Sequence, residues 1–80
     1  MGYDRKYGRV TLERGTIGDD EPVMVFRAQD ALAPAMMAVY YELCELAGSP
    51  QHHLAGVAAA REAFLDWQQA NPTKVPESSQ

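Results

Sequence analysis

Apolar and polar residues alternate with the period of a β-strand in the first part of the chain. Val10 and Leu12 are separated by a polar residue, as in a half-buried strand, and residues 23–26 are apolar on both faces, which predicts a better-covered strand. Glycines, acidic residues and a proline lie between these two runs and are typical of a turn. The pattern therefore predicts an antiparallel β-hairpin over residues 8–27.

A helical period replaces the alternation over residues 30–47. Apolar residues recur there at spacings of three and four, which places them on one stripe of a helix that we expect to be buried. A second apolar set lies beside this stripe, so the hydrophobic arc is wider than a surface helix needs, and the helix should have two packing partners. The stripe consists of Leu32, Met36, Val39, Leu43 and Leu46, and the second set consists of Met37, Tyr40, Tyr41 and Cys44.

A second helix is predicted over residues 50–70. Gly48 suits the left-handed position after the first helix, Ser49 is a good N-cap for the second, and Pro50 suits its first turn. Because the connection is so short, the two helices must be antiparallel neighbours. The second helix is longer than the first, and its C-terminal end should overhang.

These elements predict an α+β fold in which an N-terminal antiparallel β-hairpin packs on a C-terminal antiparallel αα-hairpin. Residues 1–7 are polar with no clear period and are expected to be a flexible N-terminus. Residues 8–71 then form a single ββαα domain, and residues 72–80, which contain two prolines, are expected to be a disordered tail. A domain this small buries a small share of its surface, so we expect a partner to stabilise it.

Charge and cysteine content narrow the class of function. A net charge of −4 with seven scattered basic residues argues against a nucleic acid partner, because phosphate binding needs clustered Lys and Arg. No run approaches the roughly 20 apolar residues of a membrane span, so no membrane association is expected. Cys44 is the single cysteine, which fits a reducing compartment.

Motifs for catalysis or metal binding are missing from the sequence pattern. His52 and His53 are adjacent, so on a helix they point about 100° apart and cannot readily hold one metal ion. The acidic run at residues 19–21 lacks the ligand ladder of a calcium site. No glycine-rich phosphate loop, nucleophile elbow or Cys/His pair is found, so we expect a non-enzymatic protein without cofactor or metal.

A polar trio between the second predicted strand and the first predicted helix is the best candidate for ligand or partner binding: Arg27, Gln29 and Asp30. Asp30 is expected to be an N-cap, or to start a turn before a helix that begins at Pro34. Arg27 and Gln29 stand near a helix N-terminus, where an anion or a peptide carboxylate can be held. The alternative is a structural ion pair from Arg27 to Asp30 or to a glutamate.

Arg61 is a further candidate for ligand or partner binding, because it stands among apolar residues of the second helix. Its guanidinium can reach solvent by extending its stem along apolar surface. Alternatively, it can form a buried or interfacial pair with a carboxylate.

Apolar surface that one chain cannot cover predicts self-association. Closed two-fold pairing is the commonest arrangement, so we expect a homodimer or a higher even-numbered oligomer. The expected oligomer interface consists of Met37, Tyr40, Tyr41, Phe64 and Trp67.

The runs GTIGDDEPVMVFRAQDALAPAMMAVYYELCELAGSP and FLDWQQANPTKVPES resemble small proteins encoded by phages of actinobacteria, especially mycobacteriophages. The resemblance spans about residues 8–77, and its most distinctive pieces are DDEP, FRAQD and the AGSP helix junction. That group has no assigned activity. The resemblance therefore implies a phage accessory protein in the cytoplasm of a bacterial host and supplies no catalytic residue.

The sequence leaves three functions open. The first is binding of a host protein by a homo-oligomer, through the hairpin edge or the overhanging helix face. The second is a sponge for a nucleotide-like small ligand, with Arg27, Arg61 and Arg9 gathered at a pocket between subunits. The third is a structural or assembly component of the phage.

Overall fold

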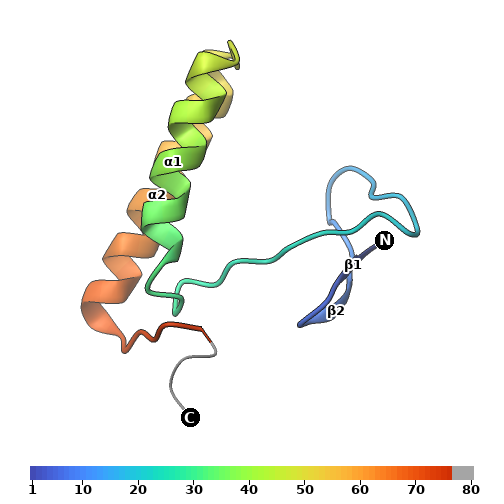
Figure 1. The fold of residues 1–80 in the computed structure, drawn as a ribbon, viewed down its shortest axis with the longest axis horizontal. Helices are drawn as coiled ribbons and strands as arrows, with labels where there is room; N and C mark the ends of the chain where they lie inside the picture. The colour runs from blue at the N-terminus through green and yellow to red at the C-terminus, as the bar shows by residue number, and fades with distance from the viewer. Residues whose placement is uncertain (77–80) are drawn as a thin grey trace.

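The computed structural model describes residues 1–76, which form a small β-hairpin, a long connection and a pair of helices (Figure 1). Strands β1 (Gly2–Asp4) and β2 (Gly8–Val10) make a two-stranded antiparallel sheet, and helices α1 (Ala33–Leu46) and α2 (Gln51–Ala70) follow. The α+β class predicted from the sequence is confirmed. In the described part of the chain, neither helix is long and apolar enough to cross a membrane.

The hairpin uses an earlier part of the chain than the sequence pattern predicted. Its register pairs Gly2 with Val10 and Asp4 with Gly8. The predicted hairpin over residues 8–27 is therefore wrong in its bounds, and β1 occupies the segment that was expected to be a flexible N-terminus.

The cause of this early hairpin is the turn that joins its strands. The Asp4 carboxylate accepts hydrogen bonds from the backbone N–H groups of Lys6 and Tyr7, both at 2.8 Å, and Gly8 has a φ of +88°. An aspartate that starts a turn and a glycine in a left-handed conformation that ends it are typical of short hairpin loops. Both residues lie within a polar segment, which has no alternation of apolar and polar residues that would predict a strand.

Residues 23–26, predicted to be the second strand, run instead as a connection that leaves the hairpin (Figure 1). The backbone of residues 21–23 lies beside β1. The backbone N–H of Tyr3 donates to the Glu21 carbonyl at 3.2 Å, and the N–H of Val23 donates to the Tyr3 carbonyl at 3.0 Å. β1 therefore lies between β2 and this segment, and further along Met24 and Val25 are exposed while Phe26 is half-buried.

The hairpin does not pack on the helices, contrary to the sequence prediction. Within residues 1–76, close backbone contacts between elements join β1 to β2 and α1 to α2, and Figure 1 shows the hairpin held away from the helix pair. Strands of three residues present too little apolar surface to cover a helix pair. The radius of gyration is 14.2 Å, compared with about 11.6 Å for a compact domain of this length.

The junction between α1 and α2 is a Schellman motif. Gly48 has a φ of +83° and donates its N–H to the Glu45 carbonyl at 3.1 Å, and the Ser49 N–H donates to the Cys44 carbonyl at 2.9 Å. These bonds satisfy carbonyls that the last turn of a helix leaves free. The prediction that Ser49 caps α2 is wrong, because Ser49 belongs to the end of α1. Pro50 occupies the N-cap position, without a side-chain hydrogen bond.

α1 packs on α2 with the second apolar set, which lies beside the stripe that was predicted to be buried. Cys44 is buried and Met37 and Tyr41 are half-buried, so the second apolar set faces α2. Most of the first set, expected to be the buried stripe, is exposed. Both apolar sets have a helical period, so the period alone does not determine which of them packs on α2. We call the exposed residues the α1 stripe; they are Leu32, Val39, Leu43 and Leu46, with exposed fractions from 55% at Leu32 to 86% at Leu46.

α2 is longer than α1, as predicted, and its last turns extend past the start of α1 (Figure 1). Gln68 attaches this overhang to the loop before α1. Its side-chain amide donates to the carbonyls of Ala28 and Asp30, both at 3.0 Å. The overhang is therefore partly covered within one chain, through a residue that the sequence pattern did not single out.

The chain after α2 returns to the same loop. The Lys74 N–H donates to the Gln29 carbonyl, and the Ala31 N–H donates to the Lys74 carbonyl, each at 2.9 Å. Residues 72–76 were expected to belong to a disordered tail, but these bonds hold them against the loop. The rest of that predicted tail, residues 77–80, lies outside the described residues.

Two glycines give a matched test of the helical arrangement. Gly48→Ala is expected to lower the free energy of unfolding by about 1 kcal/mol, because alanine is strained at a φ of +83°. Gly56→Ala is expected to raise it by about 0.5–1 kcal/mol, because Gly56 lies inside α2 with open space where a Cβ would be. Urea unfolding measures both changes. Shifts of the same sign would contradict the assigned junction.

Candidate functional site

A cleft of about 490 Å³ lies between the hairpin turn and the connection that leads to α1. Residues 3–7 and residues 22–27 line its two sides, together with Gln29, Asp30 and Lys74. Small-molecule sites have volumes of roughly 300–1,000 Å³, so the cleft is large enough to hold a ligand. The trio predicted from the sequence lines this cleft, which makes it the candidate site.

Asp4 ties the two sides of the cleft together. Its buried carboxylate accepts the N–H groups of Lys6 and Tyr7 in the turn and, with its other oxygen, the N–H of Val25 at 2.7 Å. The hydrogen bond from Tyr7 is the main cause that lowers the pKa of the Asp4 carboxyl below its ordinary value. The Val25 and Lys6 bonds act in the same direction, and burial acts against them. The cleft therefore keeps its shape through internal hydrogen bonds.

Asp30 starts the turn that leads into α1. One of its carboxylate oxygens accepts the N–H of Leu32 at 2.8 Å, and its backbone carbonyl accepts the N–H of Ala33 at 3.1 Å. Leu32 occupies the N-cap position of α1, and Pro34 lies in the first turn. Of the two roles predicted for Asp30, the turn before the helix is the one observed, and α1 begins at Ala33, one residue before the start predicted with that turn.

Arg27 keeps a charge that the fold does not neutralise. Its guanidinium carbon lies 5.9 Å from the centre of the Tyr7 ring, a cation–π contact, and no ion pair among residues 1–76 involves it. The ion pair predicted as an alternative, from Arg27 to Asp30 or to a glutamate, is not found among residues 1–76, where the Asp30 carboxylate bonds to the Leu32 N–H. Gln29 bonds to Lys74 through its backbone, which leaves its side chain to line the cleft.

Arg61 acts within the helix pair and does not line the cleft. Its Nε donates to the Pro34 carbonyl at 2.9 Å, from the middle of α2 to the first turn of α1. Its predicted pairing with a carboxylate is not found in the described part of the chain. Arg9 lies at the hairpin and donates to the Met1 sulfur at 3.6 Å. A single chain therefore does not bring Arg27, Arg61 and Arg9 to one pocket.

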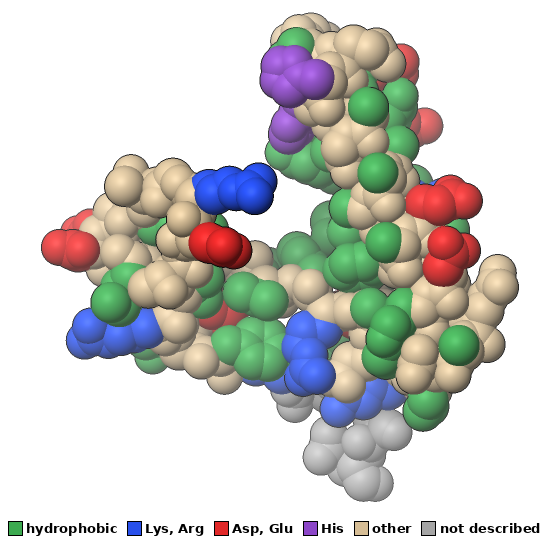
Figure 2. Space-filling model, turned by 180° about the vertical axis from the view of Figure 1, so that it is seen from behind, with side chains coloured by type: hydrophobic (Ala, Val, Ile, Leu, Met, Phe, Trp, Pro, Cys, Tyr) green, Lys and Arg blue, Asp and Glu red, His purple; other side chains and the backbone are tan. Residues whose placement is uncertain are grey.

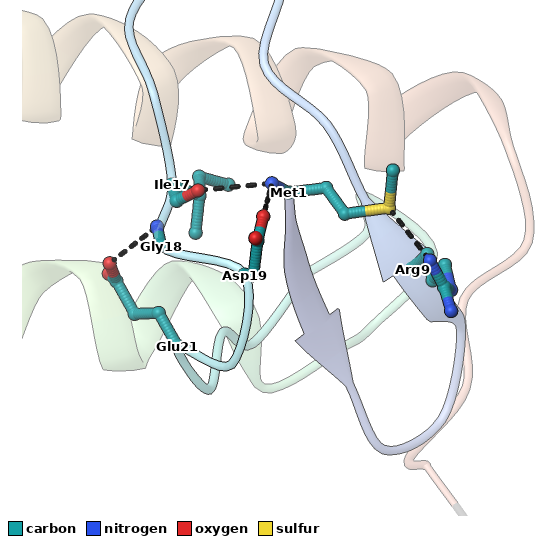
Figure 3. A network of polar contacts seen from close by, with 6 residues as sticks. All are labelled: Met1, Arg9, Ile17, Gly18, Asp19 and Glu21. Carbon is teal, nitrogen blue, oxygen red and sulfur yellow. Dashed lines mark hydrogen bonds and ion pairs between the residues drawn. The ribbon is translucent and has the colours of Figure 1, made fainter.

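The loop after β2 is fastened to the N-terminus by a small polar network (Figure 3). The Met1 amine donates to the Ile17 carbonyl at 3.0 Å and lies 3.6 Å from the Asp19 carboxylate. Glu21 accepts the N–H of Gly18 at 3.2 Å in the same loop. In the acidic run, the Asp19 carboxylate therefore holds the loop to the N-terminal amine, and the Glu21 carboxylate closes a bond within the loop.

The fold brings Cys44 and His53 together, a pair that the sequence pattern did not reveal. Their Sγ and Nε2 atoms are 3.6 Å apart, and the Tyr40 ring meets the His53 ring edge-on with 6.1 Å between centroids. A hydrogen bond with Cys44 raises the pKa of the Tyr40 phenol above its ordinary value. Cys44 is buried, and among residues 1–76 no three potential metal ligands form a cluster. The contact joins the last turn of α1 to the first turn of α2, beside their junction.

The five residues predicted to form the oligomer interface fall into two groups. Met37, Tyr41 and Phe64 are half-buried within one chain. Tyr40 and Trp67 remain nearly half exposed. The α1 stripe, which was not in the predicted set, presents more exposed apolar surface than either group.

Comparison with known proteins does not place the chain in a family. No family model matches it, and no match is found among curated proteins or solved structures. The fold and the site alone therefore define its class: a small α+β protein with an unpartnered apolar helix face and a cleft lined by basic and apolar residues.

Proposed function

We propose that the chain is a small non-enzymatic binding protein that works as a homo-oligomer and targets a protein of a bacterial host. The exposed α1 stripe carries this proposal. Its four large aliphatic side chains follow one helix face over about four turns. A contiguous apolar face of this size on an isolated chain usually marks an interface.

The total exposed surface supports association. The chain exposes 6266 Å², whereas a compact monomer of 8.8 kDa exposes about 4,800 Å². The difference is larger than the roughly 800 Å² that each partner buries in a standard interface. Leu54 is the only large aliphatic side chain buried within residues 1–76. A second protein surface would supply the missing burial.

A second copy of the chain is the occupant that best fits the α1 stripe. The stripe contains leucine and valine and no charged residue, so a partner surface of the same composition is complementary to it. Two-fold pairing lets one patch cover its own counterpart without any further surface. In such a dimer the two α1 helices face each other, and each α2 covers the other side of its own α1.

The host-directed part of the proposal rests on two supports. The resemblance to small actinobacterial phage proteins favours a bacterial host and its cytoplasm as the setting. The ionisable side chains of Asp4, Asp30 and Arg61 are occupied by hydrogen bonds to the backbone, which favours binding over catalysis. Recovery of one specific partner from host lysate would support the proposal. Co-purification with virions would favour an assembly component instead.

Leu43→Glu is expected to dissociate the oligomer, because it places a charge at the centre of the α1 stripe. Sedimentation equilibrium at micromolar concentration should give at least twice the chain mass of 8.8 kDa for the wild type and a mass close to 8.8 kDa for this variant. Ala55→Glu is the matched control, since it adds the same charge to an exposed position on α2. It should leave the mass unchanged.

The wild-type measurement decides the proposal even if the Leu43→Glu chain unfolds. A folded wild-type monomer whose mass does not depend on concentration would refute self-association. Equal loss of mass in both glutamate variants would show that added charge, rather than its position on the stripe, disrupts the oligomer. Circular dichroism of each variant reports whether the helices persist.

A further inference from the structure

The cleft beside the hairpin combines apolar walls with basic residues, and it lies apart from the α1 stripe proposed for self-association. Its walls are mainly apolar, with a run of aliphatic and aromatic side chains on one side and tyrosines on the other. A ligand with a flat apolar body can make extensive contact with such walls. The apolar and aromatic lining residues are Tyr3, Tyr7, Val23, Met24, Val25 and Phe26.

Basic residues are concentrated around the same cleft. Four of the seven basic residues of the chain line it, although the whole chain has a net charge of −4. Three acidic residues, Asp4, Asp20 and Asp30, also line it, so basic residues outnumber acidic ones by one, and the Asp4 and Asp30 carboxylates are directed toward backbone N–H groups. In Figure 2, basic side chains flank hydrophobic ones where the hairpin and helix lobes meet. The cleft therefore favours an anionic group beside an apolar body.

Arg27 is held where it can meet that anionic group. The Tyr7 ring positions its guanidinium at 5.9 Å without cancelling its charge. The walls are also set in advance, since the Val25 N–H bonds to Asp4 and the Val23 N–H bonds to Tyr3. A site that needs little rearrangement loses less affinity to ordering on binding.

We propose that this cleft binds a small amphipathic anion, with its flat apolar body against the tyrosine and phenylalanine side chains and its phosphate or carboxylate against Arg27. Lys74 and Arg5, which line the same cleft, add attraction for the negative group. The site lies within one chain, so it does not depend on the α1 stripe or on the oligomeric state.

Naphthyl phosphate, naphthoate and neutral naphthalene methanol test the proposal with one apolar body and three head groups. Amide NMR titration of the wild-type protein should give at least fivefold tighter binding of an anion than of the alcohol, with the largest shifts at residues 23–27. The phosphate and carboxylate probes distinguish the two kinds of anionic group. Rising salt should weaken binding of the anions and leave the alcohol unchanged.

Arg27→Gln is expected to weaken binding of the preferred anion about tenfold, with no change for the alcohol. Arg14→Gln is the matched control, because Arg14 is exposed and does not line the cleft. If the Val25 amide resonance of the ligand-free Arg27→Gln variant is shifted, this substitution has altered the cleft, and Lys74→Gln provides the second variant. Lys74 bonds to the loop through its backbone, so replacing its side chain leaves those bonds in place. This variant should weaken binding of the anion at least threefold.

Three results would overturn the proposal. The first is equal affinity for the anions and the alcohol. The second is a set of shifts centred on the α1 stripe. The third is an equal loss of affinity in the Arg14 variant and the cleft variants.

Discussion

Leu54→Ala is expected to lower the free energy of unfolding by about 2–4 kcal/mol and to leave much of the chain unfolded at 37 °C. Leu54 is 6% exposed and is the largest hydrophobic side chain buried between α1 and α2. Truncation removes its transfer free energy and leaves a cavity that the helices fill only in part. A domain of this size has only a few kcal/mol of net stability to lose. Urea unfolding followed by circular dichroism at constant protein concentration measures the change.

Leu12→Ala is the control for this experiment. The same atoms are removed, but Leu12 lies half exposed in the loop after β2, so a change below about 0.5 kcal/mol is expected. Equal effects at the two positions would mean that Leu54 does not form the centre of the helix packing.

Acidification is expected to destabilise the wild-type protein through Asp4, and Asp4→Asn is expected to remove that dependence. Three backbone N–H groups stabilise the ionised carboxylate, so its pKa is lower in the folded chain than in the unfolded chain. The stability it contributes is present above the ordinary pKa of 3.8 and is lost as the pH falls through the folded value. Thermal melts between pH 7 and pH 2 should show a falling melting temperature.

At pH 7, Asp4→Asn is expected to lower the melting temperature by about 5 °C or more, because an amide replaces charge-assisted hydrogen bonds in the turn. Asp66→Asn removes one carboxylate from an exposed position on α2 and is the matched control. It should retain the wild-type profile below pH 4. If Asp4→Asn also retains that profile, another acidic group is responsible and the role assigned to Asp4 is wrong.

The sequence by itself determined the elements whose signals are local. A three- and four-residue apolar period predicted the first helix, and Gly48 and Pro50 predicted the left-handed residue after it and the start of the second helix. Such signals act between residues a few positions apart, so the sequence shows them before any tertiary contact is known. The turn signal in Asp4 and Gly8 was equally local, but the strands beside it have three residues each, which is too short for an alternating apolar pattern to be recognised.

The candidate site was determined by the sequence only in part. The position of Arg27, Gln29 and Asp30 between two elements identified them as one group, and all three line the cleft. The opposite side of the cleft comes from the hairpin turn, and Lys74 comes from beyond α2. The Asp4 carboxylate joins the hairpin turn to Val25, and backbone hydrogen bonds join Lys74 to the loop before α1. These partners are far apart in the sequence, so no local pattern reveals them.

Only the tertiary structure decided which apolar face of α1 meets α2. Both faces satisfy a helical period, and the choice depends on contacts such as the Cys44 and His53 pair and the bond from Arg61 to Pro34. Each of these contacts joins residues on different helices, so it exists only after the helices have docked. That choice leaves the α1 stripe exposed, because α2 is the one element that packs on α1 in the described part of the chain and it covers only one of the two apolar faces.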